Sequence, residues 1–347
     1  MVTQKDIADK LGLTRTTVAR ALSGGTVSEE TRLRVCEEAE RMGYVRNSAA
    51  AGLATKRARV VYAFIIATVD ESYGEQMTNG IREVSQLWKS YSFEVRPVRT
   101  DITCPGDQCA HQRVSFLEVI RHEQVDGVIF SALCRENLEL AERECAQRGI
   151  PLMTLDTIYP CKKLCHVGPD YFRLGTYSAA FMAGLMMQRG RIFTMSYDDG
   201  YELGSERMRG FLDKLSTYPD IECRNVTLDR MSEESYTPAL ERAFDEFDPV
   251  AVYAPYHVDY VGRFLKRRGL EHKVITISNG VNREVEEYLY DGTVNGIVSA
   301  RPYFLGAVAA NNFFKYFYRP SELLRGEIDV ACDIYIRENY NRYDRFY

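Results

Sequence analysis

Hydroxyl and guanidinium side chains gather near the start of the chain, at Thr14-Arg15-Thr16-Thr17 and at Arg20. A hydroxyl can donate or accept a hydrogen bond, and an arginine guanidinium can donate to two acceptors at once. Side chains of these types can therefore bind DNA base edges and phosphates. The spacing places Arg20 about one helical turn after the cluster. The alternative is an ordinary surface helix whose polar residues are solvated.

Cysteine and histidine occur together twice, as Cys-x4-Cys-x-His at residues 104–111 and as Cys-x3-Cys-His at residues 161–166. Tight zinc sites use two pairs of ligands, with cysteines about two to four residues apart. Here a Pro-Gly turn interrupts the first group, and the groups are far apart in the sequence. Incidental loop cysteines are the better interpretation, so we expect no metal and no other cofactor.

Signatures of catalysis are also missing from the sequence. It has no Gly-x-x-x-x-Gly-Lys-Ser/Thr phosphate loop and no Gly-x-Ser-x-Gly nucleophile elbow. Its five histidines show no pairing with a nucleophile, and its nine cysteines are an odd number scattered along the chain. We therefore expect a protein that is not an enzyme and that keeps its cysteines as reduced thiols.

The first 45 residues predict three short helices that would carry the polar cluster. Thr3 with Asp6 forms the pattern of a capping box, and Gly12 can end the first helix in the left-handed conformation. Thr14 and Ser28 can cap the second and third helices. The predicted inner faces are Ile7, Ala8 and Leu11; Val18, Ala21 and Leu22; and Leu33, Val35, Ala39 and Met42. Helix, glycine-containing turn and helix is the helix-turn-helix arrangement.

The rest of the chain predicts a different architecture. Residues 47–57 are rich in alanine but too short for a stable lone helix, which indicates a linker that a partner orders. From residue 59 on, apolar strand-like runs alternate with helical segments, in two successive sets. This alternation predicts two α/β lobes with doubly wound parallel sheets and a ligand cleft between them.

Charge is divided unevenly between these regions. Eleven basic and seven acidic residues give residues 1–59 a net charge of +4, within a whole-chain charge of -5. A basic head on an acidic body is typical of a protein whose head alone meets a polyanion. The composition, with 45% hydrophobic residues, excludes disordered, fibrous and membrane-spanning classes, and the first residues lack a secretory signal. We expect a cytoplasmic location.

The N-terminal sequence resembles the lactose-repressor/galactose-repressor family of bacterial transcriptional regulators. The resemblance lies in residues 2–23, 27–32 and 43–47, and extends to Ala50 and Leu53. It implies a helix-turn-helix headpiece over residues 1–46, a hinge helix or linker over residues 47–58, and a body over residues 59–347 like type I periplasmic sugar-binding proteins. In that body we expect lobe one at about 59–160 plus 295–319, and lobe two at about 161–294 plus 320–347.

The same resemblance implies DNA-binding residues. Arg15, Thr16 and Arg20 fall at base-reading positions, and Leu53 at the hinge position that wedges into the minor groove. Arg15 differs from the Tyr or Ala that is often found at this position in the family, so the sequence of the DNA operator cannot be inferred. The other expected DNA contacts are Thr3, Thr14, Thr17, Ser28, Asn47 and Ala50.

Effector-binding residues follow from family-like segments of the body. Arg207 precedes a Gly-Phe pair, Asp156 follows a predicted strand, and Tyr73 lies in the first strand-helix loop. Acidic residues usual at two other positions are replaced, so that Tyr256, His257 and Asn279 stand as substitutes. Each of these residues has an alternative structural role. The replacements predict an effector other than a common hexose.

Together these features predict a ligand-responsive DNA-binding regulator. The resemblance implies a homodimer on a pseudo-palindromic operator, repression of carbohydrate or related catabolic genes, and a small-molecule effector, a sugar or sugar derivative, that acts by lobe closure. The alternative is a sugar-type binding module without DNA function. Whether the effector induces or corepresses is left open.

Overall fold

The computed structural model describes residues 2–23, 27–42, 58–66, 71–100, 108–157, 159–197, 202–230 and 232–340. It divides into two units, Met1–Lys56 and Arg57–Tyr347, which we treat separately. Within the described residues, no helix is long and apolar enough to cross a membrane. Among the described residues, the cysteines are not joined by disulfides.

The described residues of the first unit form the helices α1 (Gln4–Leu11), α2 (Arg15–Ser23) and α3 (Glu29–Arg41). Thr3 and Asp6 form the predicted capping box, and Gly12 ends α1 at φ 66°. The backbone N–H groups of Thr17 and Thr31 donate to the hydroxyls of Thr14 and Ser28, at 3.1 and 3.3 Å, as predicted for N-caps. The core of this unit is formed by Ile7, Ala8, Val18, Ala21, Val35 and Ala39.

One predicted core residue of this unit is misplaced. Leu33 is 57% exposed, whereas Val35 and Ala39 are buried and Met42 packs against the core. The spacing Val35, Ala39, Met42 already defines one face of a helix, and a residue two positions before Val35 points to the opposite side. The prediction that Leu33 lies on the inner face is therefore wrong.

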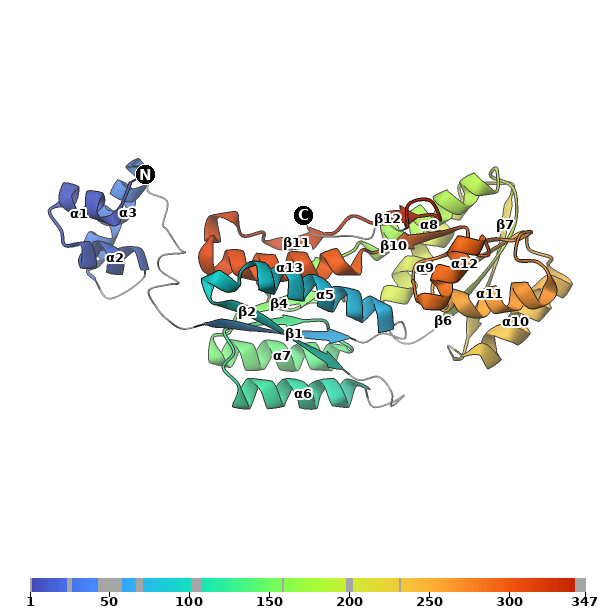
Figure 1. Cartoon of the computed structure of the whole chain (residues 1–347), viewed down its shortest axis with the longest axis horizontal. Helices are drawn as coiled ribbons and strands as arrows, with labels where there is room; N and C mark the ends of the chain where they lie inside the picture. Colours follow the sequence, from blue (N-terminus) through green and yellow to red (C-terminus); the bar gives the residue numbers. More distant parts are fainter. Residues whose placement is uncertain are drawn as a thin grey trace. The chain divides into compact units, whose positions relative to one another are not determined.

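The first sheet of the second unit is wholly parallel, with strand order β11-β5-β4-β3-β1-β2 (Figure 1). Alternate residues of β1 face two different cores: Val61, Ala63 and Ile65 one, Val60, Tyr62 and Phe64 the other. Burial on both faces explains the uninterrupted apolar sequence of this strand. The strands are β1 (Arg59–Ile66), β2 (Phe93–Thr100), β3 (Gly127–Phe130), β4 (Leu152–Leu155), β5 (Cys165–Gly168) and β11 (Gly326–Asp329).

Helices cover both faces of this sheet. Helices α5 (Glu71–Leu87) and α13 (Pro302–Tyr318) lie on one face, and α6 (Gln108–His122) and α7 (Arg135–Arg148) lie on the other (Figure 1). Gly80 and Gly306 allow α5 and α13 to touch: a Cβ on either would lie within 2.1 Å of a carbonyl oxygen of the other helix. Short 3-10 helices occur at Lys89–Tyr91 and Pro320–Glu322.

The second sheet has the order β12-β10-β9-β8-β6-β7 and is parallel except for β12, which pairs antiparallel with β10. Helices α8 and α9 pack against one face, and α10, α11 and α12 pack against the other. The strands are β6 (Gly190–Tyr197), β7 (Ile221–Leu228), β8 (Ala251–Ala254), β9 (Ile275–Ser278), β10 (Gly296–Ser299) and β12 (Asp333–Tyr335). The helices are α8 (Tyr171–Leu185), α9 (Glu202–Leu215), α10 (Glu233–Glu246), α11 (Val258–Arg268) and α12 (Arg283–Asp291).

The chain passes between the two sheets three times: from β5 to α8, from β10 to α13, and from β11 to β12. These crossings differ from the expected lobe boundaries. Strands β5 and β11 belong to the first sheet, although residues 161–294 and 320–347 were assigned to lobe two. Strand β10 belongs to the second sheet, although residues 295–319 were assigned to lobe one. Strand pairing, which periodicity does not encode, decides these positions.

Candidate functional site

The surface of α2 carries the polar cluster of the first unit. Arg15, Thr16 and Arg20 are exposed on this helix, and the hydroxyls of Thr14 and Thr17 lie 2.8 Å apart. Thr3, Thr14 and Ser28 each cap a helix N-terminus, so their expected DNA contacts would come from groups that also fix the fold. The remaining expected DNA contacts, Asn47, Ala50 and Leu53, lie outside the described residues.

In the second unit, two tyrosines, one of them the expected Tyr73, meet at the carboxylate of Asp156. Tyr73 of α5 and Tyr171, the first residue of α8, both donate to Oδ1 of Asp156, at 2.7 and 2.6 Å. Asp156 follows β4, is buried, and has a φ of 66°. Burial raises the pKa of its carboxyl, while the two tyrosine hydroxyls and the charge of Arg207 oppose that shift. This carboxylate therefore links the first sheet to a helix of the second.

Arg207 lies on α9 and is only 6% exposed. The guanidinium carbon is 4.3 Å from the centroid of the Tyr256 ring and 5.7 Å from that of Tyr171. Its Nε is buried, and Arg207 has no hydrogen bond or ion pair with any residue that the structure describes. Thus Tyr73, Asp156, Arg207 and Tyr256, all expected from the sequence, are brought into one cluster, with Tyr171 between them.

Contact between α8 and α9 fixes the backbone of Arg207. A Cβ on Gly175 would lie 1.9 Å from the carbonyl oxygen of Arg207, and one on Gly210 would lie 2.0 Å from that of Phe172. Only glycine permits this approach. The same contact between α8 and α9 positions Tyr171 at the start of α8. There Asp170 caps the helix by accepting a hydrogen bond from the backbone N–H of Arg173 at 2.9 Å.

His257 follows β8 and precedes α11, with a φ of 48° in the left-handed region. Its ring stacks on Tyr260 at 4.6 Å between centroids, and its Nδ1 is 3.8 Å from Oδ1 of Asp259. Burial lowers the pKa of this imidazole. Within the described residues its buried Nε2 has no hydrogen-bond partner. His257 also lines a small pocket together with Tyr256, Asp259, Ser278 and Asn282.

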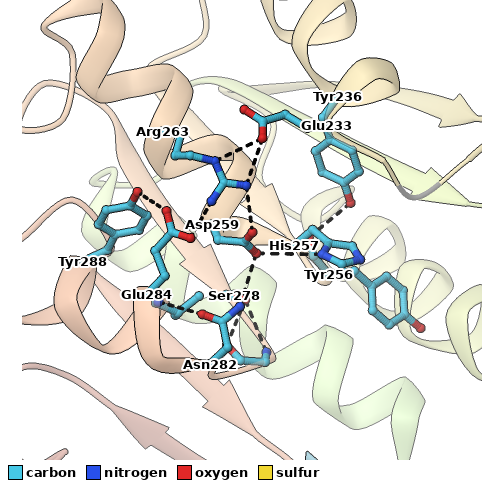
Figure 2. Close-up of polar contacts among 12 residues, drawn as sticks. Glu233, Tyr236, Tyr256, His257, Asp259, Arg263, Ser278, Asn282, Glu284 and Tyr288 are labelled. Carbon is cyan, nitrogen blue, oxygen red and sulfur yellow. Dashed lines mark hydrogen bonds and ion pairs between the residues drawn. The ribbon is translucent and has the colours of Figure 1, made fainter. Parts of the chain in front are cut away.

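Arg263 contacts three carboxylates, one of them that of the pocket residue Asp259, as Figure 2 shows. Its guanidinium forms ion pairs with Glu233 at 3.0 Å, with Asp259 at 3.2 Å, and with Glu284. Asn282 donates to Asp259 at 3.4 Å, and Tyr288 donates to Glu284 at 2.5 Å. This network joins α10, α11 and α12. Among the described residues that line the pocket, Asp259 is the only acidic one, and the network pairs it with Arg263.

Asn279, the last expected effector contact, is held inside the second lobe. Its Nδ2 donates to Ser178 at 3.0 Å and to the carbonyl of Val298 at 2.9 Å, and its Oδ1 accepts from Tyr253 at 2.5 Å. Both amide N–H groups are therefore used by the protein. What remains for a ligand is one lone pair of the oxygen.

Two residues of the site were missed in the sequence. Tyr171 directly follows the helix-capping Asp170, and an aromatic residue at the start of a helix that follows a strand was the available signal. Asp259 sits in the first turn of α11, where an acidic residue is also expected simply from the helix dipole. Among the described residues, no group of three His, Cys, Asp or Glu side chains could hold a metal ion.

Comparisons with known proteins give matches to both units. Residues 3–47 match the model of bacterial regulatory proteins of the lacI family, and residues 62–317 match the periplasmic binding protein domain. The catabolite control protein A of Priestia megaterium is 28% identical over 173 residues, which are 49% of this chain and 48% of that protein. The transcriptional regulator RegA of Clostridium saccharobutylicum is 28% identical over 139 residues, 39% of each chain. The chain thus spans about half the length or less of these curated relatives.

Solved structures show the same fold for the body. A glucose-galactose binding protein from Geobacillus stearothermophilus superposes with a TM-score of 0.69 at 17% identity, covering 82% of this chain and 99% of that one. A solute binding protein from Burkholderia graminis, in complex with D-arabinose, superposes with a TM-score of 0.69 at 18% identity, covering 83% and 98%. At this identity the likeness concerns the fold alone.

Proposed function

Because this chain belongs to the periplasmic binding protein domain family and carries the N-terminal domain of lacI-family bacterial regulatory proteins, we propose that it is a ligand-responsive, DNA-binding transcriptional regulator. The observation that carries the proposal is the presence, in one chain, of a helix-turn-helix unit and a two-sheet body with a polar cluster at its strand ends. A DNA-binding unit does not require a ligand-binding body, and a ligand-binding body does not require a DNA-binding unit, so their combination in one chain favours ligand control of DNA binding.

In this proposal the first unit binds a DNA operator. Helix α2 enters the major groove, and its exposed Arg15, Thr16 and Arg20 contact base edges. Thr14, Thr17 and Asn47 contact phosphates or the groove, and Leu53 wedges between the central base pairs. Thr3, Ser28 and Ala50 are further DNA contacts. Two such units in a homodimer gain affinity over one by effective concentration, which favours a pseudo-palindromic operator.

The body binds the effector in this proposal, through Tyr73, Asp156, Arg207, Tyr256 and His257, with Asn279 in a supporting position. Since Tyr171 and Asp156 link a helix of one lobe to a strand end of the other, a ligand at Asp156 changes the free energy of lobe closure. The protein represses carbohydrate or related catabolic genes from the cytoplasm, and DNA release or DNA binding follows from the lobe angle that the effector favours.

The first test is selection of bound DNA from a random-duplex pool by the full chain at physiological salt. We expect a palindrome of about 16–20 base pairs. Arg20→Ala should lose specific binding, while Arg34→Ala, which removes an exposed charge from α3, should keep it. Recovery of no motif would contradict the proposal and leave the alternative, a small-molecule binding module without DNA function.

Two further outcomes test the mode of binding. Leu53→Ala should weaken specific binding far more than non-specific binding, because an apolar wedge acts only at the central base step. Equal loss of both would contradict the wedge. Affinity should fall steeply as salt rises, since phosphate contacts release counterions. A flat salt response would contradict a phosphate-binding headpiece.

A further inference from the structure

Arg207 is a buried cation that forms no ion pair with any residue that the structure describes. It is 6% exposed, its Nε is buried, and among the described residues it has neither a hydrogen bond nor an ion pair. The rings of Tyr256 and Tyr171 lie close to the guanidinium. A buried charge costs several kcal/mol unless it is paired and hydrogen-bonded, so this arrangement is incomplete.

The tyrosine rings do not complete it. A ring interacts with a cation through its face, whereas the N–H donors of a guanidinium lie in the plane of the group. The rings of Tyr256 and Tyr171 therefore stabilise the charge of Arg207 without accepting its hydrogen bonds. An arginine with covered faces and unused edges is suited to bind a planar or tetrahedral anion by two parallel N–H···O bonds.

The described carboxylates of the candidate site, Asp156 and Asp259, have other hydrogen-bond or ion-pair partners. Asp156 accepts two tyrosine hydroxyls at one oxygen, at 2.7 and 2.6 Å. Asp259 pairs with Arg263 and accepts from Asn282. The Asn279 amide is consumed by Ser178 and Val298. Among the described residues of the candidate site, Arg207 therefore lacks an ion-pair partner.

We propose that Arg207 binds an anionic group of the effector, a carboxylate or a phosphate, so that the effector is an acidic sugar derivative and not a neutral sugar. This inference rests on the proposed function, because it assumes that the cluster around Asp156 is the effector site. The acidic group would lie against Arg207, and hydroxyl groups would lie toward Asp156 and His257.

The first experiment needs no knowledge of the effector. The thermal midpoint of the full chain is measured at constant ionic strength in chloride, formate, sulfate or inorganic phosphate. A bound anion stabilises the folded state by mass action, so we expect the wild-type midpoint to rise by about 2 °C in tens of millimolar formate or phosphate. Arg207→Met should abolish this rise.

A matched control lies on the same helix. Arg209 is exposed, pairs with Glu206 at 2.5 Å and covers the Phe172 ring. Arg209→Met should keep the full response to anions. An equal response in wild type and Arg207→Met would overturn the proposal, because general salt effects act on both alike. Should Arg207→Met fail to fold, Arg207→Gln provides the same loss of charge with a polar edge retained.

The second experiment distinguishes the two sources of the anion. Binding of D-glucuronate, D-galacturonate, D-gluconate and D-glucose 6-phosphate is compared by calorimetry with binding of D-glucose and D-galactose. We expect an acid to bind at least about tenfold more tightly than its neutral parent, with that preference lost in Arg207→Met. Preference for the uronates or for the phosphate identifies the group.

The results separate this inference from the proposed function. A neutral sugar that binds wild type and Arg207→Met equally, in a protein that selects an operator, overturns the inference and keeps the function. Anion stabilisation that depends on Arg207, in a protein that selects no operator, keeps the anion site and removes the regulator.

Discussion

Arg207 and Arg263 both lie in the second lobe, and the structure surrounds them in opposite ways. Arg263 is 31% exposed in its side chain and faces three carboxylates, Glu233, Asp259 and Glu284 (Figure 2). Arg207 is 6% exposed and forms no ion pair with a described carboxylate. The more exposed arginine, Arg263, thus has more ion pairs within the protein than the buried Arg207. We infer that a satisfied arginine holds helices together here, whereas an unsatisfied one is kept for a ligand.

The largest effect that this comparison predicts is on stability, at Arg263. Arg263→Met leaves Asp259 buried without its cation, so the free energy of unfolding should fall by about 2 kcal/mol, measured by urea denaturation. Arg267→Met is the matched control, because Arg267 is 55% exposed and pairs with Glu233 alone at 3.5 Å. It should cost less than about 0.5 kcal/mol. Similar losses of unfolding free energy in both variants would contradict the inference that the three ion pairs of Arg263 hold the helices together.

A smaller effect measures the coupling within the network. Asp259→Asn and Arg263→Met, singly and together, form a double-mutant cycle around a pair that is 3.2 Å apart. Since removing one partner strands the other, the interaction energy should be about 1 kcal/mol. Additive losses would show that Arg263 acts through Glu233 and Glu284 instead.

At Arg207 the same substitution should cost almost nothing. Without added anion, Arg207→Met removes an unpaired buried charge and keeps an apolar stem against Tyr256, so its unfolding free energy should stay within about 0.5 kcal/mol of wild type or exceed it. A loss of about 2 kcal/mol or more, as at Arg263, would assign Arg207 a structural role.

The smallest effect is a pH dependence set by Asp156. Burial raises the pKa of this carboxyl, so its protonated form persists above its usual range. As pH rises through that pKa, Asp156 ionises beside Arg207 and competes with an added anion. Sulfate, which keeps its charge between about pH 4 and 8, should therefore stabilise the chain less as pH rises. Asp156→Asn should remove this trend, and a trend that persists in this variant would exclude Asp156 as its source.

The sequence predicted local features best. Caps at Thr3, Thr14 and Ser28 and the end of α1 at Gly12 are confirmed, because each depends on residues a few positions apart. The alternation of strands and helices predicted the two sheets for the same reason. The expected lobe boundaries failed at β5, β10 and β11, where the chain changes sheets and only long-range strand pairing decides.

The candidate site divides in a similar way. The resemblance placed Tyr73, Asp156, Arg207 and Tyr256 among the expected effector contacts, and the structure brings them together. It could not show that the Asn279 amide is spent on Ser178 and Val298, because these partners come from α8 and β10. Nor could it show that Tyr171 reaches Asp156, since the hydrogen bond joins two separate elements. Which hydrogen-bond partners a polar side chain finds depends on how distant elements pack in the folded protein, so the sequence alone does not predict them.

The late crossing from β11 to β12 has a consequence for the gene that encodes this chain. Strand β11 completes the first sheet and β12 the second, and the two are adjacent in sequence near its end. During translation, helices α1, α2 and α3 are synthesised long before either sheet receives β11 or β12. A premature stop codon before β11 would therefore remove an edge strand from both lobes at once, while helices α1, α2 and α3 would still be made.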